Sequence, residues 1–283
     1  MEAINIGEQL SKEQNLIIKT LGVRSSIDPG EEFAARADFL STLLIQSKKK
    51  CLVLGISGGV DSLTAGLIAQ QAVVNARLSG HISKFVAMRL PYGEQQDEAD
   101  AQLSLDLIQP DEVLTLNIKE PSDQMLLSVK RSGVSFDDVL QEDFILGNIK
   151  ARQRMIAQYA IAGREEGLVI GTDHAAEALM GFFTKHGDGA CDVAPLSGLN
   201  KRQVRALAQY GGAGEQLFNK TPTADLETLA PLKPDELSFG VSYNEIDNFL
   251  EGKTVSEKVY EIILKQYKAT EHKRSLPVSP SFT

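Results

Sequence analysis

The sequence predicts an α/β protein with a doubly wound parallel sheet flanked by helices. Three apolar, strand-like runs alternate with two helical periods between residues 51 and 118. The first run, residues 51–55, breaks into the turn Ser57-Gly58-Gly59, and a helix restarts directly after it. Since parallel strands need right-handed crossovers, this alternation predicts helices on both faces and ligands beyond the carboxyl ends of the strands.

Each element is predicted from its own period and its boundary residues. Two helices precede the sheet, and the second begins at Pro29, because proline suits the first helical turn. The predicted helices cover residues 8–21, 29–47, 63–78, 98–108, 143–165, 174–183, a stretch that begins at Lys201, and 255–267. The predicted strands cover residues 51–55, 84–90, 112–118 and 168–172. Residues 182–199 and 218–240 are rich in glycine or proline, so we expect functional loops or lids there.

The composition argues against several classes of protein. Lys and Arg total 29 against 38 Asp and Glu, a net charge of −9, which disfavours a broad nucleic-acid-binding surface. No run approaches ~18 apolar residues and the first 21 residues lack a signal-peptide core, so we expect a cytoplasmic protein without a membrane partner. Cys51 and Cys191 have no C-x-x-C spacing, so neither a zinc site nor a disulfide framework is indicated.

The turn after the first strand has the composition of a phosphate site. Ser57, Gly58 and Gly59 leave the backbone N–H groups open, and the following helix adds its positive end. Asp61 would repel phosphates unless it holds a cation, so the composition implies nucleotide bound with Mg²⁺. No lysine follows Gly59, which excludes the common ATPase loop, and the residues resemble the SGGxDS loop of ATP pyrophosphatases. Alone, the same turn could belong to any doubly wound domain.

A second acidic residue follows a later strand end. Glu177 stands in the first turns of a predicted helix, either as a residue favoured by the helix dipole or as a metal ligand. With Asp61 at another strand end, we favour a shared Mg²⁺ site. Asn148 and Arg152 share a helix face, and the segment 182–189 joins aromatic, cationic and glycine residues suited to a flat, phosphate-bearing substrate. For Phe182 and Phe183 alone, core packing is the more common role.

Several separated motifs together resemble the ammonia-dependent NAD synthetase family. The motifs are residues 57–62, 89–93, 171–177, 181–192, 200–202, 221–227 and 271–274. The resemblance implies a Rossmann-like fold of the adenine nucleotide alpha hydrolase type in one domain, 1–283, with N-terminal helices over 8–47, a nucleotide-binding core over 50–215 and a closing C-terminal part over 216–275. It also implies ATP-driven amidation of deamido-NAD by ammonia to NAD, through an adenylated nicotinate carboxylate, in a homodimer.

The matching motifs imply the roles of individual residues. ATP would be bound by Gly55, Ile56, Ser57, Gly58, Gly59, Val60, Asp61, Ser62, Arg89, Gln95, Thr172, Lys201 and Thr223. Deamido-NAD would be bound by Arg152, Lys185, Asp192, His272 and Lys273, and Mg²⁺ by Asp61 and Glu177. Asp61, Lys201 and Asp192 would be catalytic, and Asp192 and Asp173 are candidates for the proton acceptor of ammonia. Taken singly, Lys201 could be an exposed helix residue, and Lys201→Ala is expected to lower turnover with the fold intact.

Two other functions remain open at this stage. One is another ATP pyrophosphatase, such as a tRNA-modifying or GMP-forming enzyme, although the acidic charge disfavours tRNA. The other is a nucleotide-sensing module without turnover. Only about 50 residues precede the first strand, too few for a glutaminase domain, so free ammonia is the expected nitrogen donor. Cys191, next to Asp192, raises the hypothesis of an oxidation-sensitive loop.

Overall fold

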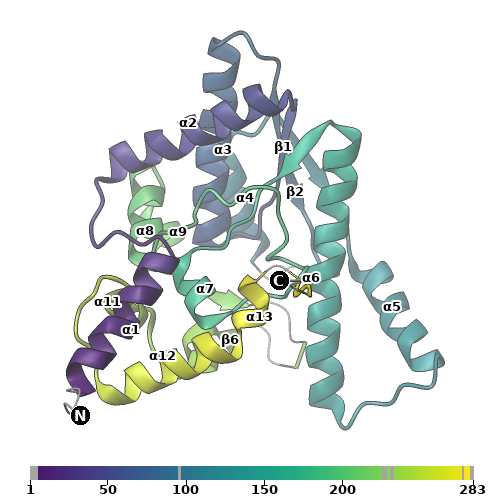
Figure 1. Cartoon of the computed structure of the whole chain (residues 1–283). Helices are drawn as coiled ribbons and strands as arrows, with labels where there is room; N and C mark the ends of the chain where they lie inside the picture. The colour runs from purple at the N-terminus through teal and green to yellow at the C-terminus, as the bar shows by residue number, and fades with distance from the viewer. Residues whose placement is uncertain (1–5, 95–96, 225–227, 230–232, 276, 281–283) are drawn as a thin grey trace.

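The sheet has four parallel strands in the order β3-β2-β1-β4 (Figure 1). The strands are β1 (Cys51–Gly55), β2 (Lys84–Arg89), β3 (Glu112–Thr115) and β4 (Gly167–Val169). The structure is a computed structural model, and it describes residues 6–94, 97–224, 228–229, 233–275 and 277–280. The predicted fold class is confirmed, since all three strand pairings are parallel.

The strand order reverses between β1 and β4. The chain runs outward from β1 to β2 and β3, then returns to place β4 on the other side of β1. A further parallel bridge pairs Ile170, just after β4, with Val193. In open α/β sheets the crevice at such a reversal is where ligands bind. The loops that follow β1 and β4 both open into this crevice.

Helices cover both faces of the sheet, because alternate β1 residues point to opposite sides. Leu52 and Leu54 belong to the core under α2 (Pro29–Ser47), α3 (Val60–Leu78) and α8 (Lys201–Tyr210). Cys51 and Val53 belong to the core under α6 (Val139–Arg164). α4 (Glu98–Ile108) packs on α3, and α5 (Lys119–Arg131) lies outside α6, at the right edge of Figure 1.

Most predicted elements are confirmed, and the exceptions have physical reasons. α2 and α4 have the predicted bounds, and Asp28 caps α2 by accepting the N–H of Glu31. The third strand ends at Thr115 instead of residue 118, since it is a half-exposed edge strand. α5 was not predicted; of its residues only Ser122 is buried, although its apolar residues lie on one face. α6 begins at Val139, four residues early, because Asp138 caps it.

The C-terminal part and the first helix form a separate hydrophobic cluster around α7 (Ala175–Met180). Phe239, Tyr243, Phe249 and Tyr260 are its buried aromatic residues. The contributing helices are α1 (Ile6–Thr20), α10 (Asp235–Phe239), α11 (Tyr243–Leu250) and α12 (Glu257–Ala269). Figure 1 shows α1, α11 and α12 together with α7 below the sheet. Short elements complete the fold: α9 (Glu215–Phe218), α13 (Glu271–Arg274) and the hairpin of β5 (Thr223–Ala224) with β6 (Lys233–Pro234).

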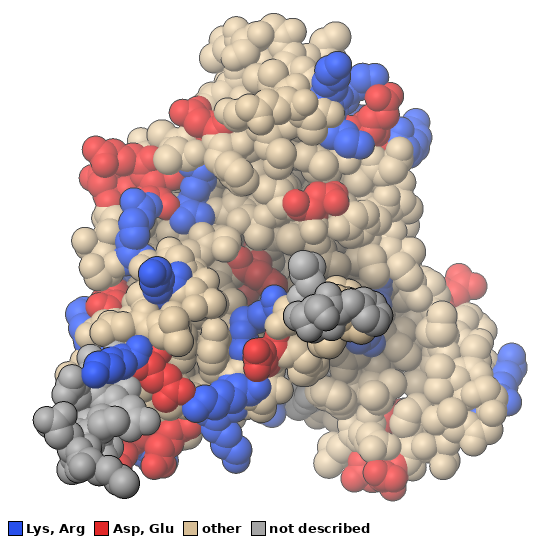
Figure 2. All heavy atoms as spheres, viewed as in Figure 1, with Lys and Arg blue, Asp and Glu red and all other residues tan. Residues whose placement is uncertain are grey.

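The surface carries mixed charge. Figure 2 shows acidic and basic side chains interspersed over one face, with no broad basic area on it. Among the residues that the structure describes, no helix has the length and apolar character needed to cross a bilayer.

Candidate active site

The glycine turn after β1 is a hydrogen-bonded loop. The Ser62 hydroxyl accepts the Ser57 N–H at 3.2 Å and donates to the Gly59 carbonyl at 3.1 Å, and the Ser57 hydroxyl accepts the Gly59 N–H at 3.2 Å. Gly58 has φ +89°, and a Cβ there would lie 2.9 Å from the Ala101 nitrogen. The first turn of α4 therefore packs directly on the loop, and only glycine fits at position 58.

A buried arginine supports the loop from below. Arg89, at the end of β2, is 3% exposed and donates to the Ile56 carbonyl at 2.6 Å. It also pairs with Glu98 in the first turn of α4. These contacts tie the loop, β2 and α4 together.

The first turn of α3 opens toward a cavity. Gly59 is its N-cap and offers no side-chain cap, so first-turn N–H groups are not satisfied by a capping side chain. Val60, Asp61 and Ser62 line the cavity at this point. The end of the helix therefore has the donors and the dipole direction of an anion site.

Lys201 reaches the same place from the first position of α8. Asn200 caps this helix in a reciprocal capping box with Gln203. The two carboxylate oxygens of Asp247, on α11, accept the N–H groups of Lys201 at 2.9 Å and Arg202 at 2.8 Å. The backbone of Lys201 is thus fixed from two directions, and its side chain is 1% exposed.

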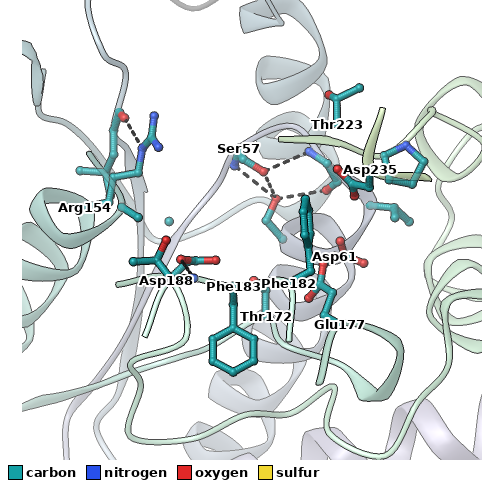
Figure 3. Close-up of a pocket in the computed structure, with 18 of the residues that line it drawn as sticks. Ser57, Asp61, Arg154, Thr172, Glu177, Phe182, Phe183, Asp188, Thr223 and Asp235 are labelled. Atoms are coloured by element: carbon teal, nitrogen blue, oxygen red, sulfur yellow. Dashed lines mark hydrogen bonds between the residues drawn. The ribbon is translucent and has the colours of Figure 1, made fainter. Parts of the chain in front are cut away.

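Four ionisable side chains meet at the strand ends. The Lys201 Nζ donates to Asp61 at 2.8 Å (Oδ2) and 3.0 Å (Oδ1) and lies 3.2 Å from the His174 Nε2. The same His174 nitrogen lies 3.4 Å from Asp61 and 3.6 Å from Glu177. Figure 3 shows Asp61 and Glu177 next to each other, with Thr172 nearby. The predicted partners Asp61, Glu177 and Lys201 are therefore brought together, and the alternative of an exposed Lys201 is wrong.

The charges of this cluster are strongly coupled. Burial alone would raise the pKa of Asp61, but the Lys201 charge and hydrogen bonds lower it well below its usual value. Burial and the nearby Asp61 charge raise the pKa of Glu177 well above its ordinary value. Burial, followed by the Lys201 charge, lowers the pKa of His174, so its ring is neutral. Without another cation, Asp61 is the ionised acid and Glu177 the protonated one.

The cluster fits a divalent cation. Asp61, His174 and Glu177 each offer a ligand atom, and these atoms lie within 4.8 Å of one another. The buried His174 Nδ1 has no hydrogen-bond partner among the described residues. Two carboxylates beside a phosphate-binding loop suit Mg²⁺, which prefers oxygen ligands and keeps several waters or phosphate oxygens. Asp61 and Glu177 are therefore the residues that would hold it.

Asp61, Glu177 and Lys201 of the cluster line one cavity of about 420 Å³ together with the loop. This volume lies in the range of small-molecule sites, about 300–1,000 Å³. Figure 3 shows Ser57 between two ends of the cavity, one with Thr223 and Asp235, the other with Arg154 and Asp188. The cavity can therefore hold an extended ligand that passes the phosphate loop.

Two further acids, Asp173 and Asp188, have pKa values above the usual range of aspartate. Burial, then the charges of Asp188 and Asp61, raise the pKa of Asp173 to about 8. Burial also raises the pKa of Asp188, despite the hydrogen bond that it accepts from the Thr184 N–H at 2.9 Å. Asp188 lines the cavity, and perturbed acids in or beside a cavity are typical of functional sites.

The sequence model of the NAD synthase family matches residues 32–277. The chain belongs to the NAD synthase family. It is 55% identical over 267 residues to the NH(3)-dependent NAD(+) synthetase of Burkholderia lata, covering 94% of this chain and 95% of the relative. It is 55% identical to the enzyme of the same name from Streptomyces coelicolor, covering 94% and 97%. These matches confirm the resemblance that the motifs indicated.

Solved structures of the NAD synthase family and of one related enzyme share the fold. NAD+ synthetase from Burkholderia pseudomallei superposes with a TM-score of 0.83 at 51% identity, covering 95% of this chain and 98% of that one. NMN synthetase from Francisella tularensis gives 0.79 at 34% identity, covering 91% and 100%. The fold is therefore shared by enzymes whose names give two different products.

Most of the residues predicted to bind ATP line the cavity. They are Gly55, Ile56, Ser57, Gly59, Val60, Asp61, Ser62, Thr172, Lys201 and Thr223. Gly58 contributes backbone to the loop, and its carbonyl accepts a hydrogen bond from Lys220 at 3.3 Å. Arg89 lies beneath the loop and supports it, and it is not among the described residues that line the cavity. Gln95 lies outside the described residues.

Four of the five residues predicted to bind deamido-NAD, all except Asp192, form a connected group, and of these four only Lys273 is among the described residues that line the cavity. Arg152 donates to the Lys185 carbonyl at 3.2 Å, and Lys185 donates to the His272 carbonyl at 2.5 Å. Lys273 lines the cavity and donates to the Gly181 and Phe183 carbonyls at 2.8 Å. α13 is thereby joined to the loop after α7.

Asp192 is placed differently from the other predicted catalytic residues. Its Oδ2 accepts the Val169 N–H at 2.8 Å, and its Oδ1 lies 3.5 Å from the Tyr159 hydroxyl, which donates to it. Asp192 is not among the described residues that line the cavity, so its contacts support β4. Its predicted roles in binding and catalysis stay predictions.

Sequence reasoning missed several residues of the site. His174 could have been found, since it stands between Asp173 and the helix that carries Glu177. Lys220, Arg154 and Asp235 come from distant segments with no local motif that announces them. They reach the cavity only through tertiary contacts.

Proposed function

We propose that this chain is an ammonia-dependent NAD synthetase that converts deamido-NAD to NAD at the expense of ATP. The observation that carries the proposal is the Asp61, Glu177 and Lys201 cluster, placed beside an open phosphate loop at the reversal of the strand order. The two relatives at 55% identity, both named NH(3)-dependent NAD(+) synthetase, support the reaction and the nitrogen donor. A reaction that consumes ATP supports the expectation of a cytoplasmic enzyme.

The first step would be adenylation of the nicotinate carboxylate. A carboxylate oxygen attacks the α-phosphorus, a new O–P bond forms, and the bond to the β-phosphate bridging oxygen breaks to release pyrophosphate. Negative charge grows on phosphoryl oxygens, where loop N–H groups and Lys201 can stabilise it without a protein nucleophile. Mg²⁺ held by Asp61 and Glu177 would supply further positive charge when bound.

The second step would be amide formation. Ammonia attacks the acyl carbon, the bond to the AMP oxygen breaks, and a proton leaves the nitrogen. Neither Asp173 nor Asp192 is among the described residues that line the cavity, but both carboxylate oxygens of Asp192 already accept hydrogen bonds, so we favour Asp173 as the proton acceptor. With its pKa raised to about 8 by burial and by Asp188 and Asp61, ionised Asp173 is a stronger base than an ordinary aspartate.

The aromatic end of the cavity supports a flat substrate ring. Phe182 and Phe183 both line the cavity, and Figure 3 shows them below the phosphate loop. Phe182 also packs edge-on against Phe239, with ring centroids 4.6 Å apart. Phe183 lies next to Lys273, whose ammonium is 5.6 Å from its ring centre. A nicotinate ring near Phe183 would therefore meet both apolar surface and positive charge.

We also propose a homodimer formed through α6. Val139, Leu140, Phe144 and Ile156 expose large apolar side chains on this helix, at 52–71% exposure. Phe144 also lines the cavity, so a second copy packed on α6 would close the site. We expect Phe144→Glu to convert a dimer to a monomer in light scattering and to weaken deamido-NAD binding. A wild-type monomer would contradict this assembly.

The function is tested by an end-point assay with deamido-NAD, ATP, Mg²⁺ and an ammonium salt. We expect NAD, AMP and pyrophosphate in equal amounts, and no NAD when glutamine replaces ammonium. Absence of NAD from ammonium contradicts the proposal. ATP binding without AMP formation would indicate a sensing module, and pyrophosphate formed without deamido-NAD would indicate another ATP pyrophosphatase.

The 34% identity to NMN synthetase makes a mononucleotide substrate the second candidate. The same assay therefore includes nicotinic acid mononucleotide as a competing substrate. A higher kcat/KM for deamido-NAD supports the dinucleotide, and a higher value for the mononucleotide favours the second candidate.

A further inference from the structure

A second lysine contacts the phosphate loop from a distant segment. Lys220 lies between α9 and β5, with its side chain 19% exposed, and its Nζ donates to the Gly58 carbonyl at 3.3 Å. It lines the cavity together with the three residues that follow it up to Thr223. No local motif predicts this contact, because 162 positions separate Lys220 from Gly58.

Two carboxylates from α4 hold the same ammonium group. The Nζ of Lys220 lies 2.8 Å from Asp97 and 2.7 Å from Asp100. Asp97 lines the cavity, whereas Asp100 is more exposed and lies on the first turn of the helix. Lys220 therefore joins α4, the phosphate loop and the segment before β5 at one point.

The Lys220 ammonium group stays protonated between these two carboxylates. Burial would lower its pKa, but the hydrogen bonds to Asp100 and Asp97 raise it above the ordinary value. An ammonium has three protons, and the three oxygens of Gly58, Asp97 and Asp100 lie around them. A phosphate oxygen can bind only if it replaces one of these partners.

The common ATPase loop places a lysine directly after its glycines to bind the β and γ phosphates. Here no lysine follows Gly59, and Lys201 contacts Asp61, whereas Lys220 contacts a glycine of the loop itself. We infer that Lys220 supplies this missing cation: it binds the end of the ATP phosphate chain that leaves as pyrophosphate and exchanges Asp100 for a phosphate oxygen. The inference rests on the proposed function for its substrate, and on the loop contacts for its location.

The first test measures binding of inorganic pyrophosphate with Mg²⁺ by titration calorimetry. Lys220→Met should weaken binding on the order of tenfold or more, because a charge-assisted hydrogen bond is lost. Lys220→Arg should recover most of the affinity, and deamido-NAD binding should not change. Lys84→Met is the matched control, since Lys84 also joins two carboxylates, Glu112 and Glu165 at 2.9 Å each, but at the opposite ends of the strands.

The second test separates ligand binding from a purely structural ion pair. If Asp100 competes with phosphate for Lys220, Asp100→Asn should tighten pyrophosphate binding, and the gain should vanish in the double variant with Lys220→Met. A structural ion pair predicts unchanged or weaker binding instead. Asp106→Asn controls for the lost charge, because Asp106 is exposed on the same helix and bonds only to Gln102 and Gln109 among the described contacts.

Either of two results overturns the inference: pyrophosphate affinity within twofold of wild type in Lys220→Met, or no tightening in Asp100→Asn. If Lys220→Met fails to fold, the Asp100→Asn comparison decides alone. A wild-type protein that binds pyrophosphate through Lys220 but forms no NAD contradicts the proposed function and leaves this inference standing.

Discussion

Lys201→Met removes the one cation that hydrogen-bonds to Asp61 in the described structure. The substitution keeps an apolar chain of similar length, so the packing of the buried stem changes little. It leaves the Asp61 carboxylate unpaired, and breaking a buried ion pair typically costs about 3–5 kcal/mol. Asp61 is 19% exposed and lines a cavity that water can enter, so we expect the lower end, about 3 kcal/mol.

Chemical unfolding in chelator at neutral pH measures this loss of unfolding free energy. Lys50→Met is the control, because the pair of Lys50 with Glu166 is more than half exposed and should contribute less than about 1 kcal/mol. Mg²⁺ should restore part of the stability of Lys201→Met, since a cation held by Asp61 and Glu177 replaces the lost charge. Acidification should also narrow the gap, because an unpaired Asp61 takes up a proton more readily than a paired one.

Turnover should fall on the order of 10²-fold in the same variant, as for other lost charge-stabilising donors. The expectation that the fold survives unchanged without Lys201 is not supported by its burial. The reasoning is refuted if Lys201→Met unfolds within about 0.5 kcal/mol of wild type, the range of ordinary surface changes. It is equally refuted if Mg²⁺ stabilises the variant no more than it stabilises the wild type.

Three further predictions follow from single contacts. Gly58→Ala should lower stability by about 1–2 kcal/mol and raise the KM for ATP, because position 58 has positive φ and a Cβ would meet Ala101; equal KM values would contradict this. Burial and then the Asp173 charge raise the pKa of the Cys191 thiol to about 11, so the thiol is protonated at neutral pH. Peroxide should therefore inactivate wild type and Cys191→Ser at equal rates, which would contradict the hypothesis of an oxidation-sensitive loop. Alkylation of Cys191 should accelerate only as the pH approaches 11. Burial and the charges of Asp188 and Asp61 raise the pKa of Asp173 in the folded protein to about 8, so stability without metal should decline as the pH rises from the ordinary aspartate pKa toward 8. Asp173→Asn should flatten that decline. An unchanged slope of stability against pH in thermal unfolding would count against the raised pKa.

The helices and strands were predictable wherever a buried face requires apolar residues at a regular spacing in the sequence. α2 begins as predicted because Pro29 marks its first turn and an apolar stripe follows. α5, which packs outside α6 with only Ser122 buried, was missed although its apolar residues lie on one face. The strand order was not predictable either, since β4 pairs with β1 through contacts more than a hundred positions apart.

The site was predictable wherever the chemistry is local. The turn and Asp61 lie within six residues, and Glu177 follows a strand end in the same way. That Lys201 touches Asp61 required a resemblance, because 140 positions separate them. Arg89 shows the limit of a motif: the resemblance named it as an ATP ligand, but the structure turns its guanidinium toward the Ile56 carbonyl of the loop.

The charge balance of the cluster links nucleotide and cation. With Lys201 protonated, Asp61 ionised, Glu177 protonated and His174 neutral, the cluster is close to neutral despite its burial. A polyphosphate alone would add several negative charges beside Asp61, and a cation alone would compete with Lys201 for Asp61 and displace the proton of Glu177. Together their charges would largely cancel, and Lys201 would be free to turn from Asp61 toward phosphate. The arrangement therefore favours binding of ATP together with Mg²⁺. Without the cation, the Asp61 carboxylate would repel the phosphates.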